Sequence, residues 1–268
     1  MVVWFRGVDG LITLADRPRG FGAHVSLNPA AIGRLHRRCD CNPGGVEPSI
    51  FLIPSPLLGP ATWEPPARVL ERRGRRTRVP SLQCVSRAAP PYWPAGVDAI
   101  VRSAGGEPVV LVPHSDSGLY IPAVIDALGD QVRGVVFVDA ALPGAGYYAQ
   151  RDCLNTLAGA DGLLPPWTSW WEESDVAELF PHAEVQARVE AEQAPMPLAY
   201  YDHLPPAPDG WDRPRRAYIW FAEPYDTGAE RASAHSWPTR HLPGNHLHML
   251  VDPDALAAAV LEMADHVP

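Results

Sequence analysis

Short apolar runs alternate with amphipathic segments between residues 49 and 140. The runs are apolar on both faces, which is typical of strands buried in a parallel sheet. We expect strands at residues 49–54, 76–82, 108–113 and 134–140 and helices at residues 61–74, 96–106 and 117–130. This alternation predicts an α/β fold, in which helices cover both faces of a mainly parallel sheet.

The same pattern returns near the C-terminus. Residues 217–222 and 237–243 are expected to form two more strands, and residues 252–267 a final helix. Asp252 followed by Pro253 suits the N-cap and the first turn of that helix. The last third of the chain therefore completes the sheet that the first half begins.

The region between these two parts is rich in proline and tryptophan, with helical patterns at residues 174–180 and 182–193. We interpret it as a mostly helical cap inserted into the sheet domain. The expected boundaries are a core of residues 48–141 and 214–268 and a cap of residues 142–213.

Residues 1–47 show neither a helical nor a strand period. They contain six arginines and four acidic residues, so their formal charge is +2. The rest of the chain has a formal charge of −11, and the sum is −9. An apolar pattern is needed to bury enough surface for folding, so we expect a poorly ordered N-terminal extension here.

The overall composition limits the classes of partner that the protein is expected to bind. A formal charge of −9 and the lack of a long basic run argue against nucleic acid or an anionic membrane surface. No apolar segment approaches the ~18 to 20 residues that cross a bilayer. The four cysteines lack C-x-x-C spacing, so we expect no structural metal or disulfide framework. We expect a cytoplasmic protein that binds a small molecule, with no cofactor and an oligomeric state left open.

Ser115 stands between a predicted buried strand and a predicted helix. A nucleophilic serine needs a sharp strand-to-helix turn with small residues two positions to either side. Those positions hold Pro113 and Ser117, where the G-x-S-x-G pattern has glycines. On the motif alone, a turn or N-cap serine is at least as good an interpretation. The flanking strand and helix, and the flexibility added by Gly118, favour a nucleophile.

Three short motifs follow one another along the chain. Residues 53–63 read I-P-S-P-L-L-G-P-A-T-W, residues 113–118 read P-H-S-D-S-G, and residues 242–253 read L-P-G-N-H-L-H-M-L-V-D-P. With these motifs the chain resembles the α/β-hydrolase superfamily over residues 48–268. The family has a His-Gly turn and a tryptophan at the first motif, often G-H-S-x-G-G at the second, and a terminal Gly-x-His loop at the third. The resemblance implies the α/β-hydrolase fold with Ser115 as nucleophile.

A serine hydroxyl reacts only when a base takes its proton, and a carboxylate must orient that base. The resemblance places the base at His246, with His248 as the competitor. The two histidines would share one face of an extended segment, which could suit a metal. We expect no metal, because no cluster of Cys, Asp or Glu accompanies them.

The resemblance leaves the acid open. In many members it follows the strand expected at residues 217–222, where Glu223 and Asp226 are candidates, although Tyr225 occupies the aligned position. In other members it follows the strand after the nucleophile helix, where Asp139 stands. Asp139 is the first choice for the acid. An almost equally good interpretation is that Asp139 is a strand-end aspartate that caps backbone amides.

The resemblance also implies an oxyanion hole. One donor is expected to be the backbone N–H of Asp116 and the other that of Leu57, because Pro56 has no N–H. A carboxylate near a developing anion raises its energy, so the Asp116 side chain should point away. Asp116 as nucleophile is the weaker interpretation, since it would place His114 at a crowded position. We expect His114 to lie behind the turn.

Aromatic residues are concentrated in the expected cap and near the expected oxyanion loop. Trp63, Trp167, Trp170 and Trp171 are candidate substrate contacts, although aromatics more often belong to a core. The expected function is a serine hydrolase that acts through an acyl-enzyme on a bulky apolar or aromatic ester, lactone or related acyl compound. The alternatives are a non-hydrolytic enzyme of the same fold, for example one that cleaves a C–C bond, and a catalytically weak small-molecule binding protein.

Overall fold

The computed structural model describes residues 47–144, 151–208, 211 and 214–267. The N-terminal extension expected at residues 1–47 lies outside the described residues, except for Glu47. In the described part no helix is long and apolar enough to cross a membrane.

A six-stranded sheet forms the centre of the fold, in the order β2-β1-β3-β4-β7-β8. All of its neighbouring strands pair in parallel. The strands are β1 (Ser49–Ile53), β2 (Thr77–Arg78), β3 (Val109–Ser115), β4 (Val132–Ala140), β7 (Arg215–Trp220) and β8 (Thr239–His241). The central strands β1 and β3 are buried along their whole length, because they are apolar on both faces. The predicted parallel α/β sheet is confirmed.

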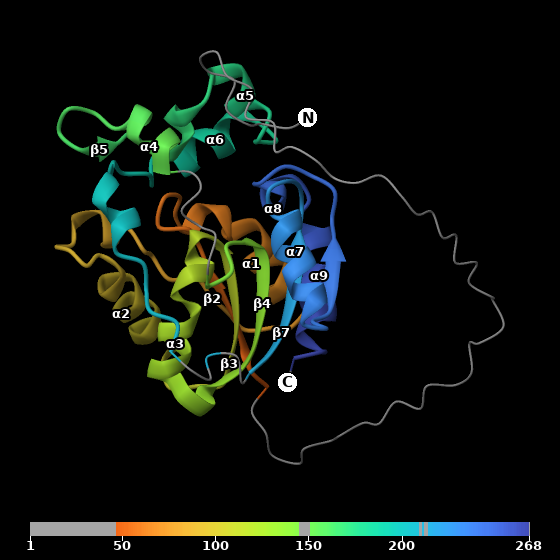
Figure 1. Cartoon of the computed structure of the whole chain (residues 1–268). Helices are drawn as coiled ribbons and strands as arrows, with labels where there is room; N and C mark the ends of the chain where they lie inside the picture. The colour runs from red at the N-terminus through yellow and green to blue at the C-terminus, as the bar shows by residue number, and fades with distance from the viewer. Residues whose placement is uncertain (1–46, 145–150, 209–210, 212–213, 268) are drawn as a thin grey trace, which may run out of the picture. The chain divides into compact units, whose positions relative to one another are not determined.

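Helices pack on this sheet in two groups, α1 against α9 and α2 against α3. Figure 1 shows α2 and α3 together on one side of the sheet and α9 on the other. The helices of the core are α1 (Glu64–Arg72), α2 (Trp93–Ala104), α3 (Ile121–Leu128), α7 (Asp226–Ala234), α8 (His248–Val251) and α9 (Pro253–Ala264). Their arrangement gives the predicted helical layers on both faces.

Helix α7 was not expected from the sequence, and its packing explains why. Its buried residues are Gly228, Ala229 and Ala232, so it has no stripe of large apolar side chains. The helix lies so close to β7 that a Cβ atom on Gly228 would stand 2.3 Å from the hydroxyl of Tyr218. Small residues permit this close contact, and small residues give a weak periodic signal.

The segments between β4 and β7 gather beyond the carboxyl ends of the strands (Figure 1). They are α4 (Arg151–Leu157), β5 (Leu163–Leu164), the 3₁₀ helix η6 (Trp167–Trp170), α5 (Glu173–Ala177), α6 (Ala183–Glu190), β6 (Met196–Pro197) and the 3₁₀ helix η7 (Leu198–Asp202). Strands β5 and β6 pair in an antiparallel manner. We call these segments the cap.

Removing the N-cap of α9 should weaken the fold. The Asp252 carboxylate accepts a hydrogen bond of 2.9 Å from the backbone N–H of Ala255. We expect Asp252→Ala to lower the free energy of unfolding by about 1 kcal/mol, measured by urea denaturation. Asp265→Ala removes the same side chain beyond the other end of the helix and should cause no such loss. Equal losses in both variants would contradict a capping role.

Candidate active site

Strand β3 ends at Ser115 in a sharp turn. The backbone of Ser115 has φ 58° and ψ −134°, a conformation that costs energy for a residue with a side chain. The 3₁₀ helix η3 (Asp116–Tyr120) begins at the next residue, so the helix expected at residues 117–130 starts as this tighter coil and becomes α3 only at Ile121. The turn places Ser115 at the carboxyl end of the central strand, with 5% of the residue exposed.

The turn tolerates Ser117 because its hydroxyl is fully used. Ser117 Oγ lies 2.9 Å from the carbonyl oxygen of Ile53 and 2.8 Å from that of His114, and it accepts the N–H of His114 at 3.0 Å. Gly118 is the residue that crowding requires, since a Cβ atom there would stand 2.1 Å from the carbonyl oxygen of Ala141. The structure thus shows a role for Gly118 in close approach, in addition to the flexibility expected from the sequence.

Asp139 and His246 are joined by a hydrogen bond of 2.7 Å between Oδ2 and Nδ1. Asp139 lies near the end of β4 with φ 43° and is 1% exposed. Its other oxygen accepts the backbone N–H of Phe221 at 2.8 Å. His246 lies between β8 and α8, and 17% of its side chain is exposed. The loops at the carboxyl ends of three strands therefore meet at this pair.

The two other candidate acids point elsewhere. The Asp226 carboxylate accepts the N–H of Thr227 at 2.9 Å at the start of α7. Glu223 is exposed. Of the carboxylates in the described part of the chain, Asp139 is the one that bonds to the His246 ring.

Burial dominates the protonation of this pair. It lowers the pKa of His246 below its usual value, so the imidazole is neutral near pH 7. Burial also raises the pKa of Asp139, and hydrogen bonds from the backbone of Phe221 and Ala222 oppose that effect. When Asp139 is ionised it can only accept, and the proton of His246 is then fixed on Nδ1 with a lone pair on Nε2.

His114 lies behind the turn, as expected, and supports His246. Its ring stacks on the His246 ring with centroids 4.5 Å apart, and its Nε2 lies 3.0 Å from the His246 carbonyl oxygen. Trp63 meets the His114 ring edge-on at 6.1 Å and is fully buried. Trp63 thus packs behind the histidines, within the core.

Tyr225 contacts both Ser115 and His246. Its ring is parallel to the His246 ring within 1°, with centroids 4.8 Å apart, and its hydroxyl oxygen lies 3.5 Å from Nε2. Burial raises the pKa of Tyr225, and a side-chain hydrogen bond with Ser115 opposes that rise. This contact could not be expected from the sequence, in which Tyr225 only occupies the position aligned with an acid.

The two residues whose backbone N–H groups are expected to bind an oxyanion have different surroundings. The N–H of Leu57 points to Ser55 Oγ at 3.3 Å, a long bond within its own loop. Asp116 is the first residue of η3, and its buried carboxylate accepts a hydrogen bond of 3.2 Å from the Tyr201 hydroxyl of the cap. The cap therefore holds this carboxylate.

The cap is tied to the loop after β1 by Glu192. Its carboxylate accepts the N–H of Ala61 at 2.7 Å and lies where a Cβ atom on Gly59 would be only 2.5 Å away. The next residue, Gln193, accepts hydrogen bonds from the backbone and hydroxyl of Thr168 at 3.0 and 3.1 Å. Residues Glu192 and Gln193 thus connect that loop to η6.

Helix η6 brings tryptophans towards His246. The Trp167 ring lies 5.9 Å from the His246 ring, and Trp171 meets Trp167 edge-on at 4.4 Å. Trp170 lies farther along, 5.9 Å from Trp171, and its Nε1 donates to the carbonyl of Pro165 at 2.9 Å. Trp167 is the tryptophan that contacts the candidate site directly.

His248 is separated from these contacts. Its ring packs against Phe221 at 5.4 Å, and burial lowers its pKa. Among residues 47–144, 151–208, 211 and 214–267, no three His, Cys, Asp or Glu side chains gather in a way that could hold a metal ion.

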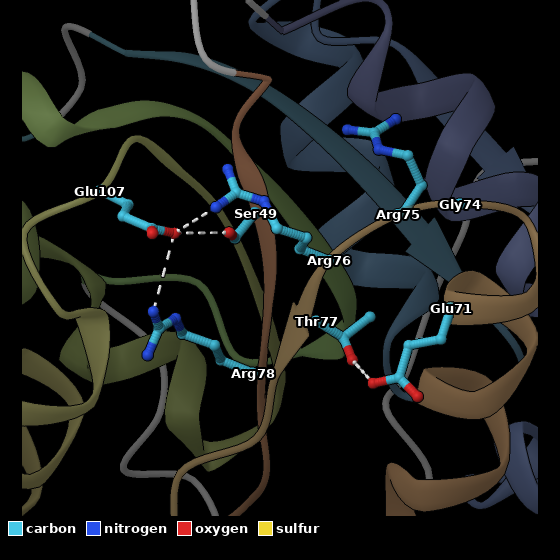
Figure 2. A pocket seen from close by; sticks show the side chains of 8 residues that line it. All are labelled: Ser49, Glu71, Gly74, Arg75, Arg76, Thr77, Arg78 and Glu107. Carbon is cyan, nitrogen blue, oxygen red and sulfur yellow. Dashed lines mark hydrogen bonds and ion pairs between the residues drawn. The ribbon is translucent and has the colours of Figure 1, made fainter.

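A hollow of about 590 Å³ lies at the end of the sheet opposite Ser115 (Figure 2). Its lining residues are Ser49, Glu71, Gly74, Arg75, Arg76, Thr77, Arg78 and Glu107. Figure 2 shows the Glu107 carboxylate between Arg76 and Arg78, at 2.8 and 3.6 Å. Arg75 pairs with Glu47 at 3.0 Å. Because carboxylates already face these arginines, the hollow is an ion-pair network at the edge of the sheet.

No protein-family model and no curated protein matches the sequence. Solved structures do match. An extracellular α/β-hydrolase from a Paenibacillus species superposes with a TM-score of 0.64 at 15% identity, over 81% of this chain and 99% of that one. Tomato methylketone synthase I gives 0.61 at 14% identity, over 82% and 99%. A pyrethroid hydrolase gives 0.59 at 19% identity, over 81% and 97%.

Sequence identities this low show only that the fold is shared. The match extends over nearly the whole length of each neighbour and includes the parallel sheet described above. The resemblance in the sequence and the likeness in structure agree. The chain therefore has the fold of the α/β-hydrolase superfamily.

Proposed function

We propose that the protein is a serine hydrolase that cleaves an ester, lactone or related acyl small molecule through an acyl-enzyme on Ser115. The observation that carries this proposal is the 2.7 Å bond between Asp139 and His246 beside the strained turn at Ser115. A buried carboxylate, a neutral imidazole and a serine on a sharp turn are the groups that acyl transfer needs.

In the proposed reaction Ser115 Oγ attacks the substrate carbonyl while Nε2 of His246 takes its proton. The tetrahedral intermediate collapses, His246 gives that proton to the leaving oxygen, and the acyl group stays on Ser115. A water molecule then attacks the acyl-enzyme by the same steps and releases the acid. Asp139 stabilises the imidazolium that forms in each half of the reaction.

The oxyanion is proposed to bind the backbone N–H groups of Asp116 and Leu57. The Leu57 N–H would exchange its long bond to Ser55 for a bond to the oxyanion, which is the stronger acceptor because it is charged. The hydrogen bond from Tyr201 holds the Asp116 carboxylate. The proposal requires that this carboxylate point away from the oxyanion.

The proposed substrate is apolar or aromatic, because Trp167 packs beside His246 and Trp171 packs against Trp167. Structural neighbours named as an esterase and a thioesterase domain support acyl chemistry on this fold. The proposal includes no cofactor, metal, nucleic acid or membrane partner, and it keeps the cytoplasm as the expected location.

A non-hydrolytic reaction at the same site is the second candidate. One structural neighbour is a methylketone synthase whose structure contains β-ketoheptanoate. Turnover of a β-keto acid that survives Ser115→Ala but not His246→Ala would favour this candidate. Loss of turnover in both variants favours the hydrolase.

Ser115 should react covalently with a fluorophosphonate probe. We expect labelling of the wild type, none of Ser115→Ala, and a rate at least about 100-fold lower for His246→Ala, because the base is lost. Ser169→Ala, an exposed serine of the cap, is the matched control. A wild type that is not labelled and does not hydrolyse p-nitrophenyl esters would favour the binding protein.

Asp139→Asn should reduce activity by about 10³- to 10⁴-fold, because an amide no longer fixes the proton of His246 on Nδ1. The measurement is kcat for a p-nitrophenyl ester. Asp226→Asn makes the same change at a rejected candidate acid and should retain wild-type kcat. The reverse outcome would move the acid to the loop after β7.

Labelling should persist in mild acid. Burial lowers the pKa of His246, so its basic form remains dominant as the pH falls below the usual value of about 6.5. At pH 5.5 an ordinary histidine is only about 10% neutral, whereas we expect the labelling rate here to stay above half of its value at pH 7. The melting temperature at both pH values shows that the protein remains folded. A tenfold loss of rate would mean that the pKa is not lowered.

A further inference from the structure

We propose that Tyr225 is a positioning residue of this site, whose ring holds the His246 imidazole and whose hydroxyl holds that of Ser115. The inference rests on the proposed function and adds a residue to it. Tyr225 contacts His246, and a hydrogen bond with Ser115 contributes to its pKa, although the sequence indicated no role for it.

The contact with His246 is a stack rather than a conventional hydrogen bond. The two rings are parallel within 1° and their centroids are 4.8 Å apart. In such a stack the phenol oxygen lies above Nε2, and the 3.5 Å distance between them matches the usual separation of stacked planes. The lone pair of Nε2 lies in the imidazole plane, so Tyr225 leaves it free to accept a proton.

His114 stacks on His246 as well, with centroids 4.5 Å apart. Tyr225 and His114 thus both stack on the imidazole. Asp139 holds the Nδ1 edge. Two ring stacks and one edge contact therefore hold the imidazole, and the Nε2 edge remains for chemistry.

The Tyr225 hydroxyl adds a constraint on Ser115. The Tyr225 hydroxyl oxygen lies 3.5 Å from Nε2 of His246, and a hydrogen bond with Ser115 contributes to the pKa of Tyr225. A serine hydroxyl rotates among three staggered positions, and a partner beside Nε2 keeps it near the base. Tyr225 remains a neutral O–H group at ordinary pH, because burial raises its pKa.

One loop performs this positioning and also holds the acid. The segment after β7 gives the Phe221 N–H to Asp139 and ends at Tyr225, directly before α7. The Tyr225 N–H donates to the Ala222 carbonyl at 3.1 Å, and the Tyr225 carbonyl accepts the Ala229 N–H at 3.1 Å. The backbone on both sides of Tyr225 is thus fixed, which fixes the ring.

The test compares Tyr225→Phe with Tyr225→Met. The first keeps the stacked ring and loses the hydroxyl, and the second loses both. We expect Tyr225→Phe to lower the rate of fluorophosphonate labelling and kcat for a p-nitrophenyl ester by about tenfold, the kinetic equivalent of one hydrogen bond, with KM unchanged. Tyr225→Met should lower the labelling rate and kcat further. It should also move the acid limb of the pH profile towards that of an ordinary histidine, because water then reaches the imidazole.

Tyr200→Phe is the matched control. It also removes a buried phenol hydroxyl, one that bonds to Tyr120 at 3.1 Å, and it should leave the labelling rate unchanged. Melting temperatures identify any loss of activity that comes from unfolding. If one of the two Tyr225 variants is unstable, the other still tests the proposal.

Wild-type labelling and kcat in Tyr225→Phe would overturn the role of the hydroxyl, and faster labelling would show that Tyr225 restrains Ser115. Either result leaves the hydrolase proposal intact, provided that labelling depends on Ser115. A wild type that is not labelled at Ser115 overturns the proposed function itself, so the two failures are distinguishable.

Discussion

The hydrogen bond between Asp139 and His246 is the interaction on which the candidate site depends. A buried carboxylate without a partner would cost several kcal/mol, so its position near the end of β4 requires both the imidazole and the N–H groups after β7. These groups come from parts of the chain far apart in sequence. Only the order β3-β4-β7 in the sheet brings them together beside Ser115.

The sheet could be predicted because burial on both faces leaves a clear pattern in the sequence. Residues 50–54 and 108–113 are apolar throughout, and they form most of β1 and β3. Strand β2 is shorter than the expected residues 76–82, and it ends before Pro80, which has no N–H for a ladder. Helix α7 was missed because close packing there uses small residues, which carry no periodic signal.

The site could be predicted in part for a related reason. Ser115, Asp139 and His246 stand at strand ends and in a terminal loop, where the order of motifs gives their approximate positions. The structure places Asp139 against His246 and leaves Asp226 at the start of a helix. The stacking of Tyr225 and the contact of Glu192 with Ala61 could not be predicted, because they join loops whose paths depend on the whole fold.

The tie between the cap and the core at Glu192 is polar. Hydrogen bonds to a carboxylate can be exchanged for bonds to water at a modest net cost, whereas separating apolar surfaces costs free energy in proportion to area. These bonds at Glu192 can therefore be exchanged for bonds to water, whereas Val189 and Trp167 of the cap belong to the same buried apolar cluster as Ala61 of the loop. Because Gln193 is attached to the helix that carries Trp167, a movement of the cap away from this loop would also displace the aromatic wall. Opening the site to a substrate and reshaping the surface that receives it would then be a single motion.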